Sequence, residues 1–378
     1  MKGCFFMQND ERHIFPGGNT PQGFYSYYDN IIDKTKAHSI YCLKGGPGVG
    51  KSSYMKKVAK EFQASGERIE YLHCSSDPHS LDGIHIPDYG IVMIDGTAPH
   101  IVDPVYPGAV DEIINLGSFW NLPKIRSHRE EIISTQHNIS YEFSRAYKYL
   151  AAAASIDDDT NTIFQSATDD DEIDKISEYI KDKIFSDKGK GTSKRTRRLF
   201  ASAITPAGLV NYADTVLYDC EHVFALKIGD NLSSFLGADA VMNRIACAAT
   251  ERGFMCETFY CPMKPVSRIE HIVIPELKTG ITVLNKYNND ETTATEVIEL
   301  MQCVNRAKIR ENAGKIEENN NMYAQLLLYA ERALKDAYWL HNTLESFYVP
   351  NIDFDAVNEN CRSVIERIKN DMDNLKTF

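Results

Sequence analysis

The chain has 378 residues, of which 43% are hydrophobic, 25% charged and 10% aromatic. This length and composition predict two or three globular domains, which excludes a peptide, a disulfide-stabilised miniature protein and an intrinsically disordered chain. The 41 Lys and Arg residues are outnumbered by 53 Asp and Glu residues, which gives a formal net charge of −12. A chain with this charge is not expected to carry an extended surface for nucleic acid or anionic lipid.

Neither a membrane span nor a secretion signal is expected. No run of about 18 apolar residues occurs, and the first ten residues become charged before a signal-peptide core could form. We therefore expect a cytoplasmic protein that does not associate with a membrane. The nine cysteines are scattered without a CxxC pair, so we interpret them as reduced and mostly buried thiols.

The chain contains an internal repeat. The segment that begins at Arg12 reads RHIFPGGNTPQGFYSYYDNII, and the segment that begins at Arg197 reads RRLFASAITPAGLVNYADTVL, with seven identities and no gap. Further along, SLDGIHIPD in the first copy corresponds to RIEHIVIPE in the second. A period of about 185 residues has the size of a domain, which indicates gene duplication and not a solenoid of short units.

Each copy begins with the same order of predicted elements. Thr20-Pro21 and Thr205-Pro206 predict the start of a helix, because threonine caps helices and proline is tolerated in their first turn. Three apolar strands that alternate with helices follow at 39–43, 68–73 and 91–94 in the first copy and at 222–226, 256–260 and 281–284 in the second. The alternation predicts two duplicated α/β domains, each with a parallel sheet flanked by helices.

Each sheet is followed by a predicted helical extension. Helices are expected over about 109–116, 123–153 and 170–186 in the first copy and over about 294–346 and 354–376 in the second. An exposed loop is expected between Ala151 and Asp171. The glycine-containing basic segment 188–198 is the natural linker. The predicted division is therefore an active domain over 1–187, a linker over 188–198 and a degenerate domain over 199–378.

The strongest local signal is a glycine-rich loop after the first predicted strand. Residues 45–52 read GGPGVGKS, a full match to the Walker A pattern GxxxxGK[ST] in the strand-to-helix position that the motif requires. The glycines let backbone N–H groups converge on phosphates, the helix adds its positive end, and the lysine reaches the β- and γ-phosphates. The predicted ATP-binding residues are Gly45, Gly46, Pro47, Gly48, Val49, Gly50, Lys51, Ser52 and Ser53.

A carboxylate for a metal ion is expected at the end of a neighbouring buried strand. Residues 91–94 are apolar and are followed by Asp95, which is the Walker B arrangement. We predict that Ser52 and Asp95 bind Mg²⁺ and that Lys51 and Asp95 are catalytic.

The group that orients the attacking water or hydroxyl must come from another segment. Asp95 is followed by Gly96, whereas many ATPases of the additional-strand type have a catalytic glutamate there. Asp77 and His100 each follow a predicted strand, and such loops line the ligand crevice of parallel sheets. Both are therefore candidates for catalysis. The alternatives are that Asp77 forms a turn and that His100 is an ordinary loop residue.

The second copy serves as an internal control. Residues 228–234 read IGDNLSS at the position of the glycine-rich loop, without the lysine, and Asn285 stands where the first copy has Asp95. We predict that the second domain has kept the fold and lost nucleotide binding. The Gly-Gly-Asn segment 17–19 is also confined to the first copy, so it is either a site element or a turn that glycine makes easier.

The basic linker allows three interpretations. Its basic residues are Lys188, Lys190, Lys194, Arg195, Arg197 and Arg198. It could be a solvated linker, a nucleic-acid patch or the source of an arginine that reaches the γ-phosphate, and Arg126 and Arg129 compete for that last role. The sequence leaves this choice open, although nucleic acid is not the expected partner.

On these motifs the chain resembles a bacterial family of tandem-domain P-loop ATPases, whose members are described only as ATPases or nucleotide-kinase-like proteins. The resemblance covers nearly the whole chain. Besides the Walker A loop it rests on FPGGNTPQGFYSYY from Phe15, HCSSDPHSLDGIHIPD from His73, IDGTAPHIVDPVYPGAVDEIINLGSFW from Ile94 and LFASAITPAG from Leu199. The resemblance implies ATP binding by a duplicated P-loop domain. The second loop, at residues 228–234, differs from the pattern expected of a chain with two intact P-loops.

These features predict a P-loop NTPase whose N-terminal domain uses Mg²⁺ and either hydrolyses ATP or transfers its phosphoryl group. Two alternatives stay open. One is a small-molecule or nucleotide kinase, which the polar segment Ser75-Ser76-Asp77 mildly favours. The other is a nucleotide-gated regulator or scaffold with little turnover. The expected partners are ATP and a small-molecule or protein substrate, and a homo-oligomer is left open.

Overall fold

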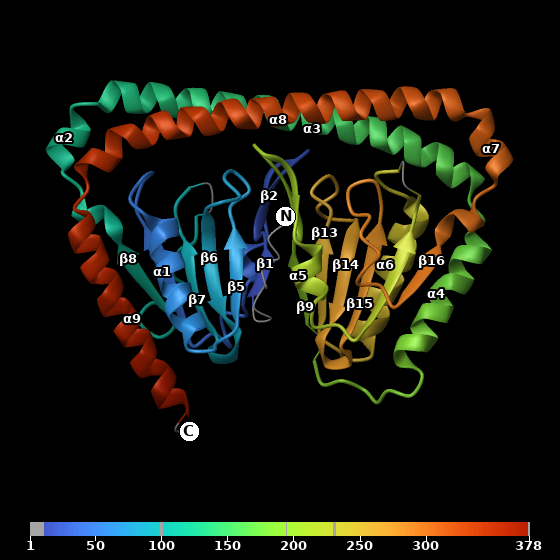
Figure 1. The fold of residues 1–378 in the computed structure, drawn as a ribbon, viewed down its shortest axis with the longest axis horizontal. Coiled ribbons are helices and arrows are strands. Elements are labelled where there is room, and N and C mark those ends of the chain that lie inside the picture. The colour runs from blue at the N-terminus through green and yellow to red at the C-terminus, as the bar shows by residue number, and fades with distance from the viewer. Residues whose placement is uncertain (1–10, 99–100, 194, 230–231, 377–378) are drawn as a thin grey trace, which may run out of the picture. The chain divides into compact units, whose positions relative to one another are not determined.

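The computed structural model describes residues 11–98, 101–193, 195–229 and 232–376. Within these residues the chain forms two compact units, each built on a six-stranded sheet with helices around it (Figure 1). The first unit consists of the described parts of Met1–Gly17, Ser26–Phe143 and Leu334–Phe378. The second consists of Gly18–Tyr25 and the described parts of Ser144–Ala333. The fold is therefore α/β with two similar domains.

The two sheets have the same strand order. In the first unit the order is β1-β5-β6-β7-β4-β8, and in the second it is β9-β13-β14-β15-β12-β16. The strands of the first sheet are β1 (Glu11–Ile14), β4 (Ser39–Lys44), β5 (Ile69–His73), β6 (Leu81–Ile86), β7 (Ile91–Asp95) and β8 (Asp111–Asn115). Those of the second are β9 (Thr196–Leu199), β12 (His222–Lys227), β13 (Cys256–Tyr260), β14 (Ile269–Ile274), β15 (Thr279–Leu284) and β16 (Glu296–Glu299).

The prediction of parallel sheets is wrong for one strand in each unit. The strand β6 runs antiparallel to β5 and β7, and β14 runs antiparallel to β13 and β15. The segments joining β5 to β6 and β6 to β7 are short, and a short connection allows only an antiparallel neighbour, because a parallel strand needs a crossover of a dozen or more residues. The sheets are therefore mixed, and the strands next to β4 remain parallel to it.

The helix predicted to begin at Thr20-Pro21 is a β-hairpin, and so is its counterpart at Thr205-Pro206. The hairpins are β2 (Gly17–Thr20) with β3 (Gly23–Ser26), and β10 (Ser202–Thr205) with β11 (Gly208–Asn211). The Thr20 hydroxyl donates to the Gly23 carbonyl at 2.7 Å and accepts from the Gln22 N–H, so it closes a turn and does not cap a helix. Gly23 has a φ of 100°, which glycine adopts without strain.

The helices differ from the predicted ones mainly in the extensions. The helices are α1 (Lys51–Ala64), α2 (Leu122–Arg126), α3 (Arg129–Ala167), α4 (Asp170–Phe185), α5 (Ala213–Leu217), α6 (Leu236–Glu251), α7 (Arg306–Glu311), α8 (Ala313–Tyr348) and α9 (Phe354–Lys376). The segment predicted as a helix over 109–116 is instead β8, because pairing with β4 outweighs its local preference.

The loop predicted between Ala151 and Asp171 is also helical, since α3 continues to Ala167. The acidic run that suggested an exposed loop is divided between two faces of the helix. Asp157 is buried in the second unit, whereas Asp158 forms an exposed ion pair with Lys264. A run of like residues is thus compatible with a helix when one of them has an internal partner.

Each sheet is covered by a helix that follows the other sheet in the sequence. The helix α9, at the C-terminal end, packs with α1 on the first sheet, and its buried residues lie on one stripe: Val357, Cys361, Val364, Ile368 and Met372. The helix α4 packs with α6 in the second unit. The division into 1–187, 188–198 and 199–378 stays a prediction about the sequence repeat, because the compact units are delimited differently.

The cysteines of the described residues are free thiols, as expected from the sequence. Across the four described ranges, no helix has an apolar stretch that is long enough to cross a bilayer.

The pH dependence of stability tests the core of the second unit. His271 is buried, its Nδ1 lies 2.9 Å from the Thr282 hydroxyl, and burial lowers its pKa to about 3 from an ordinary 6.5. Below pH 6.5 the unfolded chain binds a proton that the folded chain excludes, so His271 makes the protein less stable as the pH falls from 6.5 towards 3. We expect the stability advantage of wild type over His271→Gln, measured by urea unfolding, to shrink between pH 7.5 and pH 4.5. The exposed control His222→Gln should show no such change, and a pH-independent difference for His271→Gln would contradict the assignment.

Candidate functional site

The glycine-rich loop (residues 45–50) leaves the carboxyl end of β4, a strand with a parallel neighbour on each side. Leu43 of β4 is in register with Asp95 at the end of β7 and with Ile114 of β8. The loop then enters α1, with Gly50 as the N-terminal capping residue. The carboxyl ends of parallel strands are where ligands of α/β sheets bind. The loop and Asp95 therefore share the chemically relevant edge of the first sheet.

Glycine is required at two positions of this loop. Gly48 has a φ of 70° and Gly50 a φ of 87°, both in the left-handed region. A Cβ on Gly48 would also lie 2.8 Å from Cγ2 of Val349. Val49 between them is 1% exposed and belongs to the core of the first unit, so the loop is anchored from below by an apolar side chain.

Lys51 is held inside the loop by backbone carbonyls. Its Nζ donates to the carbonyl oxygen of Gly45 at 2.8 Å and to that of Gly46 at 3.0 Å. The same Nζ lies 3.6 Å from Oδ2 of Asp95, and both side chains are largely buried. The positive charge is thus fixed between the loop and the end of β7.

The two predicted metal ligands have hydrogen-bonded oxygens that leave further lone pairs. Oδ1 of Asp95 accepts from the N–H and the hydroxyl of Thr97, at 2.9 and 2.5 Å. The Ser52 hydroxyl oxygen accepts from the N–H of Leu81 at 3.0 Å. A carboxylate and a hydroxyl are hard oxygen donors of the kind that Mg²⁺ takes, usually with water and phosphate oxygens completing the octahedron.

The other predicted site residues have different environments. Both carboxylate oxygens of Asp77 accept bonds within its own loop, from the His79 N–H and the Ser80 hydroxyl, which favours the turn-forming interpretation. The role of Asp77 in catalysis stays a prediction. Ser53 is exposed on the first turn of α1. His100 lies outside the described residues.

Sequence reasoning missed a group of residues that cover the glycine-rich loop within the first unit. A Cβ on Gly46 would lie 3.1 Å from the ring of Trp120, and that ring packs against Tyr348 with a centroid distance of 5.8 Å. Glu345, near the end of α8, accepts a hydrogen bond from the Gly48 N–H at 3.0 Å. No periodicity or motif connects Glu345 to a loop almost 300 residues earlier, so only the folded structure brings them together.

The carboxylate of Glu345 is stabilised in its charged form. A hydrogen bond from His341 lowers its pKa most, partial burial opposes this, and the charge of His341, the Gly48 N–H and the Lys51 ammonium lower it further. The ring nitrogen of His341 lies 3.5 Å from the carboxylate oxygen. A carboxylate anion is therefore bound at one backbone N–H of the loop, that of Gly48.

Two other candidates from the sequence have structural roles in the second unit. The fully buried Asn19 donates from Nδ2 to the Ile204 carbonyl at 2.9 Å and accepts from the Tyr147 hydroxyl at 3.2 Å, which accounts for the Gly-Gly-Asn segment without a ligand. Arg197 forms a buried ion pair with Glu257 at 2.9 Å, which withdraws it from the possible γ-phosphate ligands.

The remaining basic candidates are undecided by the structure. Arg126 and Arg129 are exposed, at the end of α2 and the start of α3. Lys194 lies outside the described residues.

In the second unit, two serines of the corresponding segment bond to an internal carboxylate. Asp157 of α3 accepts hydrogen bonds from the hydroxyls of Ser233 and Ser234, each within 2.9 Å, and from the guanidinium of Arg268 at 3.1 Å. Asp157 and Arg268 are both almost fully buried. Residues 230–231 of this segment lie outside the described residues. The loss of nucleotide binding in the second domain stays a prediction.

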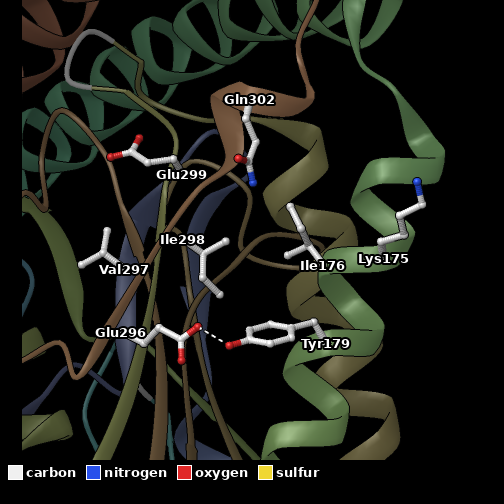
Figure 2. Close-up of a pocket in the computed structure, with 8 residues that line it drawn as sticks. All are labelled: Lys175, Ile176, Tyr179, Glu296, Val297, Ile298, Glu299 and Gln302. Carbon is white, nitrogen blue, oxygen red and sulfur yellow. Dashed lines mark hydrogen bonds between the residues drawn. The ribbon is translucent and has the colours of Figure 1, made fainter.

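A groove on the second unit offers less chemistry than the glycine-rich loop. It lies between α4 and the edge strand β16 and encloses 480 Å³ (Figure 2). The Tyr179 hydroxyl donates to Glu296 at 2.8 Å across it, and Figure 2 shows the Lys175 amine turned away from that carboxylate. Two glutamates and one lysine line the groove, so its charges do not favour an anionic ligand.

Comparisons of this chain with protein-family models, with curated proteins and with solved structures found no match. We therefore infer the function from the geometry of the first unit.

Removing Asp157 tests whether the second loop is held shut by a buried ion pair. Asp157→Ala removes one of the two carboxylates that pair with the buried Arg268, the other being Asp239, and it takes the acceptor from the Ser233 and Ser234 hydroxyls. We expect a loss of unfolding free energy of about 2–3 kcal/mol. The matched control Asp158→Ala removes the exposed pair with Lys264 one residue further and should cost less than about 1 kcal/mol. Equal effects of the two variants in urea unfolding would contradict the structural role of Asp157.

Proposed function

We propose that the first unit binds Mg²⁺-ATP at the glycine-rich loop and catalyses phosphoryl transfer from it, either to water or to a small substrate. One observation carries the proposal: Lys51, at the start of α1, is fixed between the loop carbonyls and Asp95. The loop follows β4 and Asp95 ends β7, and these two strands are parallel neighbours. This is the arrangement in which a lysine and a metal-binding carboxylate meet the same triphosphate. The fold assignment as a P-loop NTPase domain belongs to this proposal.

The seat of Glu345 supports the assignment of an anion site. The Gly48 N–H already binds one carboxylate oxygen, as expected of a loop whose N–H groups converge at a helix N-terminus. The buried indole N–H of Trp120, next to this loop, has no acceptor among the described residues and can serve a ligand oxygen. A phosphate group is the ligand that fits such donors best.

The residues present also fit a magnesium ion. Ser52 and Asp95 would supply two hard oxygen ligands, and the ion would neutralise phosphate charge and orient the β- and γ-phosphates. Three or more clustered protein ligands are not found in the described residues, which suits an ion held mainly by phosphate and water. The positioning of the triphosphate then falls to the loop N–H groups and to Lys51.

The site residues can be tested with paired variants. ATP with Mg²⁺ should raise the melting temperature of wild type by roughly 5 °C at a concentration about 100 times its dissociation constant. Lys51→Ala should weaken ATP binding about 10- to 100-fold, because a charged hydrogen bond to phosphate is lost. Asp95→Asn should reduce the effect of Mg²⁺ on ATP binding and remove most of the phosphate release. If wild type and Lys51→Ala respond equally to ATP, the assignment of the loop is wrong.

The number of bound nucleotides tests the difference between the two units. We expect isothermal titration of the full chain with ATP and Mg²⁺ to give one site per chain, because Asp157 closes the second loop. Lys51→Ala should weaken that site about 10- to 100-fold. Two sites per chain, or a site whose affinity is the same in wild type and Lys51→Ala, would contradict the assignment to the first unit.

A nucleotide-gated regulator with little turnover is the second candidate. The seating of Glu345 in the loop favours it, because an internal anion competes with the phosphates. Product analysis separates the possibilities: free phosphate indicates hydrolysis, a phosphorylated compound indicates a kinase, and bound intact ATP indicates the regulator.

A further inference from the structure

The end of α8 closes the glycine-rich loop at several points. Besides the hydrogen bond from the Gly48 N–H to Glu345, Val349 lies against the Cα of Gly48, and the rings of Trp120 and Tyr348 lie over Gly46. All these residues belong to the first unit. The loop is thus covered by polar and apolar contacts from one short segment.

This segment is held by its own backbone bonds and is not a loose end of helix. The Asn121 N–H donates to the Asn351 carbonyl at 2.8 Å, and the Asp353 N–H donates to the Phe119 carbonyl at 3.1 Å. Trp120 and Ile352 form a β-bridge between these two bonds. The bonds join the segment after α8 to the segment that carries Trp120. The group formed by Trp120, Glu345, Tyr348 and Val349, which we call the cover, therefore has a defined position over the loop.

A carboxylate and a triphosphate cannot share this position. The Gly48 N–H has one proton to donate, and a carboxylate next to phosphate oxygens would place like charges in contact in a partly buried site. Glu345 is ionised at neutral pH, because its pKa is lowered by His341 and by the loop itself. Its side chain is 38% exposed, so it can reach water once it leaves the loop.

We propose that Glu345 is an internal competitor for the phosphate site, so that ATP binds only when the end of α8 withdraws its carboxylate from the Gly48 N–H. The inference rests on the proposed binding of ATP and adds a closed state to it. ATP and the closed cover exclude each other, and each therefore weakens the other by the same factor. Any effector that pulls the end of α8 away from the loop would raise the affinity for ATP.

Titration of the full chain with ATP and Mg²⁺ tests this inference. Glu345→Gln removes the charge and keeps the shape, and Glu345→Ala removes both. We expect each variant to bind ATP at least about tenfold more tightly than wild type, since a charged hydrogen bond no longer has to be broken. The matched control Asp336→Asn removes one carboxylate from the exposed side of the same helix and should bind ATP as wild type does.

The outcomes separate this inference from the proposed function. Equal or weaker ATP binding by both Glu345 variants, with binding by wild type, would overturn the competitor and leave the ATP site intact. Loss of turnover with unchanged affinity would do the same and make Glu345 a catalytic group. Absence of binding in wild type and in Glu345→Ala alike would overturn the proposed function itself. Binding by Glu345→Ala alone would support both.

Trp120 provides a second readout of the cover. The chain has two tryptophans, and the other one, Trp339, is 59% exposed, so Trp339→Phe leaves Trp120 as the single tryptophan, which can be excited selectively over the tyrosines. In that background, inorganic triphosphate with Mg²⁺, which has no base to stack on the indole, should shift the Trp120 emission to longer wavelength. Glu345→Ala should shift it without any ligand. If the Trp120 emission changes neither with inorganic triphosphate nor in Glu345→Ala, the proposed withdrawal of the end of α8 from the loop is wrong.

Discussion

The packing of α9 on the first sheet is the interaction on which the candidate site depends. Its five buried apolar residues recur at helical spacing and join the core formed by α1 and the alternate residues of β4 and β7. At about 1.5–3 kcal/mol for each buried side chain, this stripe contributes on the order of 10 kcal/mol as an upper estimate. Because α9 follows α8 after only a short connection, docking α9 on the sheet also brings the end of α8, with Glu345, to the glycine-rich loop. A core contact at the end of the chain thus determines what lies over a loop near its beginning.

Both units place a helix carboxylate at the loop that follows their central strand, but with different consequences. In the second unit Asp157 is buried, paired with Arg268 and bonded to two serines, so its removal would leave several buried polar groups without one of their partners. In the first unit Glu345 is partly exposed and its main partners are one backbone N–H and an exposed histidine. Asp157 is part of the core, whereas Glu345 can be exchanged for another anion at a modest cost in free energy. The difference in burial gives a physical reason why one unit would retain ligand binding and the other would not.

The sequence predictions that were wrong rested on local patterns that more than one structure can satisfy. Thr20-Pro21 carries a correct local signal, since the threonine hydroxyl does bond to a nearby backbone group, but the same bond closes a hairpin as readily as it caps a helix. Residues 111–115 show no strand pattern of their own and become β8 only because β4 offers an unpaired edge. The acidic run at 157–159 indicated an exposed loop because its buried partner, Arg268, lies far away in the sequence. For β8 and for the acidic run, the deciding partner came from another segment.

Local chemistry was determined by the sequence alone. The buried strands at 39–44 and 91–95, the left-handed glycines at 48 and 50 and the lysine that follows them depend on neighbours within a few residues, so their pattern could be recognised directly. The repeat likewise predicted two similar α/β units, because duplicated patterns of burial produce duplicated sheets. Only the tertiary structure decided the direction of β6, the unit to which each long helix contributes, and the anion that occupies the loop. These features depend on contacts between residues far apart in the chain, and such contacts leave no periodic trace in the sequence.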